Sequence, residues 1–336
     1  MERFYRTIGK VSVGAVLFLI LVGGIVRSTG SGMGCPDWPT CFGLIVPPTE
    51  VTEIPASFFA AFPEYESQTF NADQSWVEYI NRLIGALIGL FVFATAAASL
   101  IFWRRDRRIV LLSFAALVLT GFEAWLGKIV VDKHLEGGFV TIHMFGAILI
   151  LSTLMLAVYL AAGHADRTMA IQPKKLPARI RWIGAIALVI TLAQILIGTQ
   201  VREHVDEIAI SMNNMGRETW IDQLGGFYSL HQGLWMVVTG LVVYWGREIW
   251  TKVPNRNMRL LVVAMYASLG LEVAFGILLS YMDLPPALQP LHLLLANILF
   301  AGQLGILLNV WGAERLLAGW VRLPKRNNSR NLVNAK

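Results

Sequence analysis

Eight apolar runs, each long enough to cross a lipid bilayer, constrain the fold of this chain more than any other feature of its sequence. A membrane-spanning helix needs about 20 consecutive, predominantly apolar residues. The runs cover residues 10–29, 77–101, 109–131, 138–161, 179–200, 226–247, 258–281 and 288–310. Charged residues make up only 15% of the 336 residues, whereas soluble domains carry about 25%. Because a chain in lipid must satisfy its own backbone hydrogen bonds, each run is expected to be a helix. The sequence predicts an all-α membrane protein with eight transmembrane helices.

The distribution of charge predicts how these helices are oriented. Basic residues cluster at the N-terminus, in every second connection and in the C-terminal tail, for example Arg3, Arg104, Lys174, Arg256 and Lys325. The connection 30–76 contains no Lys or Arg and six acidic residues. Since basic residues favour the cytoplasmic side, both termini are expected to be cytoplasmic in a multi-pass protein of the inner (cytoplasmic) cell membrane. The net charge of +6 is interpreted as this orientation pattern, so we expect surrounding lipid and no nucleic acid as partner.

A pattern of 23 residues occurs twice, at Gly121–His143 and Gly270–His292, with an offset of 149 positions. In each copy a glycine is followed by a glutamate two residues on, a second glycine four residues later and a closing histidine. The apolar runs around the copies correspond as well, so the fold is predicted to be two pseudo-symmetric four-helix bundles. The expected divisions are an N-terminal half 1–163, a cytoplasmic linker 164–178, a C-terminal half 179–312 and a basic cytoplasmic tail 313–336.

Three histidines near the starts of predicted helices are candidate metal ligands. His143 corresponds to His292 in the repeat, and His231 corresponds to Asn81, 150 positions earlier. Ionisable groups inside a membrane are costly and commonly functional, and two imidazoles on facing helices can ligate a haem iron from both sides. The alternative is that each histidine is buried and hydrogen-bonded to a carbonyl group. Zinc is disfavoured because neither half offers three or four nitrogen or sulfur ligands. The remaining histidines fall in predicted connections and are expected to be solvated: His134, His164 and His204.

The two halves differ at the position that Asn81 occupies. A neutral amide is a poor iron ligand, so a haem bound by His143 alone would keep an open face for chemistry. His231 and His292 would instead hold a closed, six-coordinate haem. We therefore expect the first half to react, with Asn81 and His143 among the candidate catalytic residues, and the second half to hold a cofactor.

Three carboxylates lie in the predicted helices near these positions. Glu78 is three residues before Asn81 on the same helix face, so it is a candidate catalytic carboxylate; the alternative is an ion pair with Arg82. Glu123 and Glu272, the glutamates of the repeat, are interpreted first as interhelical hydrogen-bonding residues. The alternative for both is a protonated carboxyl group that lines a pocket.

Both cysteines of the chain, Cys35 and Cys41, lie in the connection 30–76. A non-cytoplasmic compartment permits disulfides, so a bond between them is predicted, with a pair of free thiols as the alternative. A metal site is disfavoured because no histidine is near them in sequence.

Several of these stretches resemble haem A synthase. The resemblance rests on the run from Arg27 to Cys41 (RSTGSGMGCPDWPTC), the stretch Glu78–Arg82 (EYINR) and the three helix-start histidines, and it extends over all eight predicted helices. It implies an oxidoreductase of two four-helix bundles that converts a methyl group of haem O into the formyl group of haem A for terminal oxidase assembly. Asn81 departs from the family pattern, which has a second histidine of the first half at this position.

The same resemblance implies roles for individual residues. A haem b cofactor is expected between His231 and His292, where it would relay electrons. The substrate haem O is expected in the first half with its iron on His143. Glu78 is expected to handle protons during successive oxidation of the methyl carbon through an alcohol and a hydrated aldehyde. The outer cysteine pair of the family corresponds to Cys35 and Cys41. Haem O synthase and an electron-transfer protein are expected partners, and self-association into a homo-oligomer is left open.

Two other functions are compatible with paired histidines in a membrane. A bis-histidine electron-transfer cytochrome would hold haem in both halves in fixed stoichiometry and would leave haem O unchanged. A haem carrier would need an open path between the two leaflets. The carrier is less favoured because every candidate ligand is expected near the outer face.

Overall fold

A computed structural model describes residues 1–65, 70–133, 138–165, 176–213 and 215–311. Within these ranges the chain is helical and forms no β-strand beyond a single bridge between Cys41 and Leu44. The long helices are α1 (Glu2–Ser28), α3 (Ala72–Ser99), α4 (Arg107–Asp132), α5 (Phe139–Ala165), α6 (Ala178–Ser211), α8 (Gly226–Lys252), α9 (Arg256–Tyr281) and α10 (Leu288–Trp311). Short helices include α2 (Ala56–Ala61) and α7 (Trp220–Gln223). The predicted all-helical fold is confirmed for the described residues.

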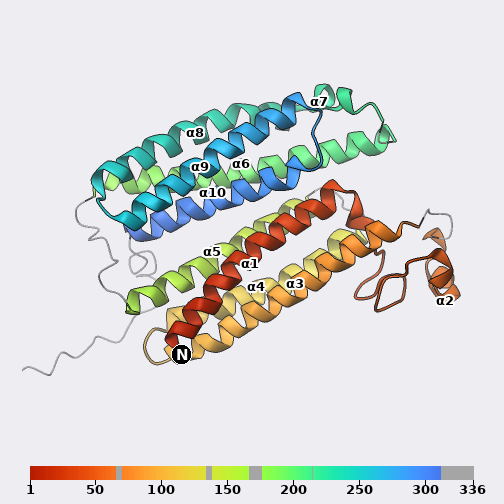
Figure 1. The fold of residues 1–336 in the computed structure, drawn as a ribbon, viewed down its shortest axis with the longest axis horizontal. Helices are drawn as coiled ribbons and strands as arrows, with labels where there is room; N and C mark the ends of the chain where they lie inside the picture. Colours follow the sequence, from red (N-terminus) through yellow and green to blue (C-terminus); the bar gives the residue numbers. More distant parts are fainter. Residues whose placement is uncertain (66–69, 134–137, 166–175, 214, 312–336) are drawn as a thin grey trace, which may run out of the picture.

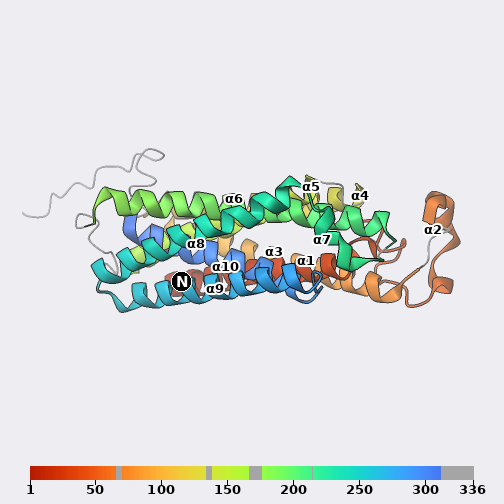
Figure 2. The ribbon, with the colours of Figure 1, turned by 90° about the horizontal axis from the view of Figure 1, so that it is seen from above.

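The long helices pack as two groups of four, which lie side by side (Figure 1). In the first group α1 and α4 each pack on both α3 and α5; in the second, α6 and α9 each pack on both α8 and α10. The order of neighbours is therefore the same in both groups. The groups meet where α1 packs on α10 and where α5 packs on α6 and α10. From above, α2 and the N-terminus lie toward opposite ends of the first group (Figure 2).

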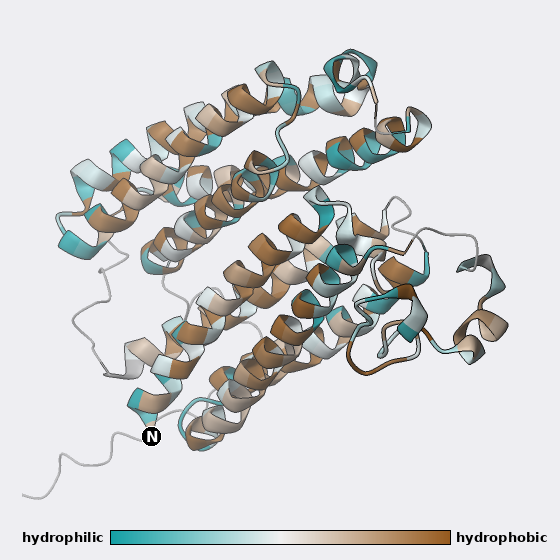
Figure 3. Ribbon diagram, turned by 45° about the vertical axis from the view of Figure 1, so that its right-hand side comes forward, coloured by the Kyte–Doolittle hydropathy of each residue, from teal (hydrophilic) through white to brown (hydrophobic). Residues whose placement is uncertain are grey.

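Among the residues that the structure describes, seven helices are long and apolar enough to cross a membrane: α1, the extended α3 region Ala72–Phe102, α4, the α5 region Phe139–Gly163, α6, α9 and α10. Apolar residues run along the lengths of these helices, and polar residues concentrate at their ends and in the connections (Figure 3). Helix α8 is equally long but falls outside this set, since polar and aromatic residues such as His231 and Gln232 lower its mean hydropathy. The predicted eighth span at 226–247 stays a prediction.

Two helices extend well beyond the apolar runs that predict them. Helix α1 begins at Glu2 rather than at residue 10, and α6 continues to Ser211 rather than ending at residue 200. Charged side chains support the extension of α6: Asp206 lies 2.5 Å from Arg202 one turn earlier and 2.9 Å from Arg27 of α1. An apolar run predicts only the part of a helix that lies in lipid. Polar turns can extend the helix beyond it where their charged side chains form ion pairs.

The extension of α6 also changes the place of one histidine. His204 lies within this helix and not in a connection, and its Nδ1 is 2.9 Å from the carbonyl oxygen of Gln200. His134 lies outside the described residues, as does the predicted tail 313–336. His164 belongs to α5.

Small residues allow the helices to approach closely inside each group. A Cβ atom at Gly184 of α6 would lie 2.4 Å from the indole of Trp245 on α8, and Trp245 is fully buried. A Cβ atom at Gly9 of α1 would lie 2.6 Å from Val158 of α5. Because lipid supplies no hydrophobic force between helices, such close van der Waals packing holds the groups together.

The connection between α1 and α3 folds as a cap over one end of the first group. It contains the Cys35–Cys41 disulfide, with an S–S distance of 2.03 Å, so the structure has the predicted bond. Both cysteines are buried and pack in one apolar cluster with Phe42, Ile54 and Phe58.

We predict that neither cysteine reacts with an alkylating reagent in the unreduced protein, because both sulfur atoms are bonded and buried. Mass spectrometry of denatured, alkylated protein should find Cys35 and Cys41 unmodified, and reduction before alkylation should modify both. Labelling of both thiols without reductant would contradict the disulfide.

Candidate functional site

His231 and His292 meet across the second group of helices. They lie near the starts of α8 and α10, which are diagonal members of this group, since each packs on α6 and α9. Their ring centroids are 6.4 Å apart, with an angle of 74° between the ring planes. A metal–imidazole bond is about 2.0–2.1 Å, so two imidazoles on opposite sides of one ion place their ring centres about 6 Å apart. The pair therefore has the separation that a shared iron requires.

A glycine from a neighbouring helix provides space beside each imidazole. A Cβ atom at Gly198 of α6 would lie 3.1 Å from Cε1 of His231, and one at Gly276 of α9 would lie 3.3 Å from Cε1 of His292. The Nδ1 atoms of both rings are buried and have no hydrogen-bond partner among the described residues. Two facing imidazoles in an apolar, close-packed setting fit a haem iron with two axial histidines.

The first group repeats this arrangement with one imidazole and one amide. His143 lies near the start of α5 and Asn81 lies on the diagonal helix α3. Gly127 of α4 sits beside His143, with its Cβ position 3.7 Å from Cε1. Gly23 of α1, which corresponds to Gly198, has nothing within 4 Å of its Cβ position. The shorter asparagine thus leaves open space where the second group has the ring of His231.

His143 is also more accessible than its counterpart. Its side chain is 42% exposed, against 23% for His292. The side-chain oxygen of Asn81 is buried without a hydrogen-bond partner among the described residues. A haem iron on His143 would therefore face a weaker set of donors than one between His231 and His292.

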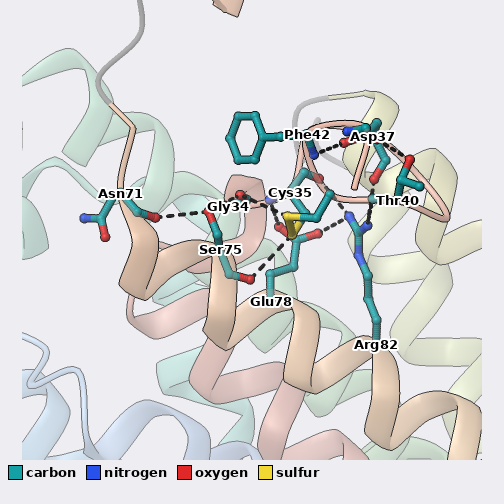
Figure 4. The surroundings of a disulfide bond; sticks show 11 residues. Gly34, Cys35, Asp37, Thr40, Phe42, Asn71, Ser75, Glu78 and Arg82 are labelled. Atoms are coloured by element: carbon teal, nitrogen blue, oxygen red, sulfur yellow. Dashed lines mark hydrogen bonds and ion pairs between the residues drawn. A yellow bond between two sulfur atoms is a disulfide. The ribbon is translucent and has the colours of Figure 1, made fainter. Parts of the chain in front are cut away.

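Glu78 is engaged by the disulfide loop (Figure 4). The carboxylate is buried, accepts a hydrogen bond of 2.7 Å from the backbone N–H of Cys35 and forms an ion pair with Arg82. The ion pair, predicted as the alternative for Glu78, is thus present in the structure. The same carboxylate also binds the backbone of the disulfide loop. Glu78 therefore connects this loop to α3 three residues before Asn81.

Arg82 also makes contacts that the sequence did not predict. Its guanidinium donates to three loop carbonyls, those of Cys35 at 2.7 Å, Asp37 at 2.6 Å and Thr40 at 3.0 Å. Its spacing from Glu78 indicated the ion pair, but the carbonyl contacts depend on how the loop folds back. Together, Glu78 and Arg82 fix the disulfide ring onto α3.

Glu203 was missed as well. It is buried on α6 and accepts hydrogen bonds from Gln200 at 2.8 Å, from the backbone N–H of Gly138 at 3.2 Å and from Thr141 at 3.2 Å. It therefore supports the start of α5, where Thr141 lies two residues before His143. The apolar run at 179–200 ends before Glu203, so periodicity gave no indication of this contact.

The repeat glutamates each approach a histidine. Oε2 of Glu123 on α4 lies 2.6 Å from Nδ1 of His143, and Oε1 of Glu272 on α9 lies 3.2 Å from Nδ1 of His292. Both contacts join neighbouring helices, but neither is an aligned hydrogen bond, so the predicted hydrogen-bonding role stays a prediction.

Relatives of this chain carry the name heme A synthase. The chain is 26% identical to the protein of that name from Shewanella oneidensis over 221 residues, which cover 64% of this chain and 62% of the relative. It is 32% identical to that of Methylobacterium radiotolerans over 213 residues, 57% of this chain and 54% of the relative. The matched regions thus span between about half and three fifths of these relatives.

A family model covers more of the chain than these pairwise matches. The model described as "COX15-CtaA: Cytochrome oxidase assembly protein" matches residues 6–304, from α1 into α10. All four positions discussed above, Asn81, His143, His231 and His292, lie inside the matched region. The chain therefore belongs to the COX15-CtaA family of cytochrome oxidase assembly proteins.

Proposed function

We propose that this protein is a haem A synthase, which oxidises a methyl group of haem O to the formyl group of haem A for terminal oxidase assembly. The observation that carries the proposal is the pair His231 and His292, whose ring centroids are 6.4 Å apart, beside an equivalent position with only one imidazole, that of His143. One half is suited to hold a cofactor and the other to react. Family membership and the relatives named heme A synthase support the same function.

The proposal includes eight spans in two pseudo-symmetric bundles with both termini in the cytoplasm of the cell. The matching order of neighbours in the two groups supports the pseudo-symmetry. Helix α8 is counted as a span because it has the length of the others and packs between α6 and α9. The basic residues at the N-terminus and in the alternate connections support the orientation.

In the second half, His231 and His292 would hold haem b, each through one ring nitrogen. Haem b, when bound there, supplies a one-electron relay. Gly198 and Gly276 keep the adjacent faces of α6 and α9 free of side chains, so both imidazoles fit inside the group. The two histidines would thus bind and orient the haem, and with both of them as ligands the site would serve electron relay rather than substrate oxidation.

In the first half, His143 anchors the iron of the substrate haem O. Asn81 offers an amide in place of an imidazole, which leaves one face of that iron accessible. Glu78 is assigned as the proton-handling carboxylate of this half, with its position fixed by Arg82 and by the N–H of Cys35. The disulfide loop thereby becomes part of the support for the reacting side.

Haem O turnover tests this function directly. Co-expression with a haem O source, followed by haem extraction and chromatography, should yield haem A. His143→Ala should abolish binding of haem O, and Glu78→Gln should spare binding but slow oxidation by about 100-fold, since proton transfer by a placed side chain contributes at least this much. Glu53→Gln, in the exposed part of the loop, is the control. Haem in both halves in fixed stoichiometry with no haem A would favour the electron-transfer cytochrome instead.

The cofactor site has its own prediction. His231→Ala and His292→Ala should each abolish a low-spin haem b spectrum while the protein still inserts into the membrane, because each removes one of two facing imidazoles. His204→Ala, a histidine of α6 bonded to its own helix, should leave the spectrum unchanged. A low-spin spectrum that survives in either ligand variant would show that the ligands are assigned wrongly.

The open face at Asn81 is tested by spin state. Electron paramagnetic resonance of protein loaded with haem O should report a high-spin, five-coordinate or weakly water-ligated iron in the first half, because an amide is not a strong-field ligand. Asn81→His should convert this signal to low spin, and Asn81→Gln should leave it high spin. Purely low-spin iron in both halves of the unmodified protein would mean that another residue takes the place of Asn81.

A further inference from the structure

We propose that Glu123 and Glu272 are positioning residues, each of which fixes the ring of a candidate haem ligand through its Nδ1 atom. The inference rests on the proposed function insofar as the bound metal is a haem iron. It assigns a role to the two glutamates of the repeat, which the mechanism above leaves unused.

In each half a carboxylate oxygen approaches a ring nitrogen of the histidine. Nδ1 of His143 lies 2.6 Å from Glu123 and Nδ1 of His292 lies 3.2 Å from Glu272. These are N···O approaches of ion-pair length rather than aligned hydrogen bonds, and neither Nδ1 atom has a hydrogen-bond partner among the described residues. Both oxygens of Glu123 and Oε2 of Glu272 are likewise buried without a hydrogen-bond partner there. Each carboxylate therefore has the imidazole as its available donor.

The repeat explains why glutamate and glycine recur at fixed spacing. Residues four apart on a helix lie on one face, so Glu123 and Gly127 of α4 present a carboxylate and an open space to the same imidazole. Glu272 and Gly276 do the same on α9. Cε1 of His143 lies 3.7 Å from the Cβ position of Gly127, and the corresponding distance at Gly276 is 3.3 Å. In each pair the glutamate approaches Nδ1 of the histidine, and the glycine lies beside Cε1 of the same ring.

The equivalent pair beside His231 works differently. Gln194 and Gly198 of α6 have the same spacing, but Nε2 of Gln194 donates a hydrogen bond of 3.0 Å to the backbone oxygen of His231. The ring is therefore not held by a carboxylate. The side chains that approach an imidazole are the glutamates Glu123 and Glu272. Gln194, whose side chain binds the backbone of His231, is an amide.

A carboxylate is suited to this task because it only accepts hydrogen bonds. It requires the proton of the histidine on Nδ1, which leaves the lone pair of Nε2 for a metal. Histidines that ligate metals commonly donate their other ring N–H to such a group, which fixes the tautomer and the ring and raises the basicity of the ligand. A purely structural interhelical bond could be made by a neutral glutamine without the cost of a carboxylate in a membrane.

The carboxylate of Glu123 occupies the space beside one glycine of α5, Gly146. A Cβ atom at Gly146 of α5, three residues after His143, would lie 1.7 Å from Oε1 of Glu123. No side chain at position 146 is compatible with this carboxylate position. Gly146→Ala therefore displaces the carboxylate without changing any ionisable group. Gly121→Ala on α4 is the matched control, since its Cβ position has nothing within 4 Å.

Redox titration of the membrane protein loaded with haem b tests the second half. Glu272→Gln should raise the reduction potential of the low-spin haem and shift its g values at unchanged haem content, because the ligand loses basicity while both imidazoles stay bound. Glu272→Asp should recover part of the shift. Glu248→Gln, which removes a buried carboxylate of α8 paired with Lys252, should leave the potential unchanged.

Titration with haem O tests the first half. Glu123→Gln and Gly146→Ala should each weaken haem O binding by about 10- to 100-fold, the loss typical of an outer partner of a metal ligand. Gly121→Ala should leave it unchanged. Unaltered potential and g values in Glu272→Gln, or unaltered binding in both first-half variants, would overturn the inference and leave the glutamates a structural role.

The ring tautomers separate this inference from the proposed function. If the unmodified protein takes up no haem, the proposed function fails, and nitrogen-15 resonance of the histidine rings still decides the inference. His143 and His292 should carry their proton on Nδ1, and Glu123→Gln and Glu272→Gln should shift it toward Nε2. Tautomers that do not respond to these substitutions would overturn the inference.

Discussion

The structure depends on one constraint: a chain in lipid has no water to bond its peptide groups, so helices must carry nearly every residue that crosses. Once the chain is divided into long helices, they can be held together only by close packing and by a few polar contacts. Gly184 against Trp245 is an example of the first kind. Few polar side chains then remain between the helices, and each of them needs a hydrogen-bonding or ionic partner there.

Much of this fold follows from the sequence, because apolar length and the internal repeat are properties of consecutive residues. The repeat also places His143, His231 and His292 on comparable helices, and the meeting of the last two across a diagonal follows from it. The ends of α1 and α6 do not follow, since polar helical turns carry no apolar pattern. The contact of Arg27 with Asp206 joins residues 179 positions apart, and no periodicity encodes a partner at that distance.

The candidate site likewise has features that the sequence predicts and features that depend on tertiary packing. The exchange of histidine for Asn81 is visible in the sequence, whereas the consequence, open space beside Gly23, requires the packed helices. Glu78 was recognised as unusual, but its tie to Cys35 depends on a loop whose path is set by tertiary contacts. Glu123 and Glu272 stand out in the repeat, yet only their distances to the imidazoles distinguish them from other buried polar residues.

The polar contacts between the two groups of helices fix how the groups are placed relative to each other. Asp206 binds an arginine from each group, and Glu203 joins α6 to the start of α5, near His143. The two groups are thereby held at a fixed separation at this end. Electron tunnelling falls off steeply with distance and needs no moving carrier over a short gap. With haem in both groups, as proposed, this rigid contact would fix the distance between the two irons, so a substitution of Asp206 would change the rate of electron transfer before it changed haem binding.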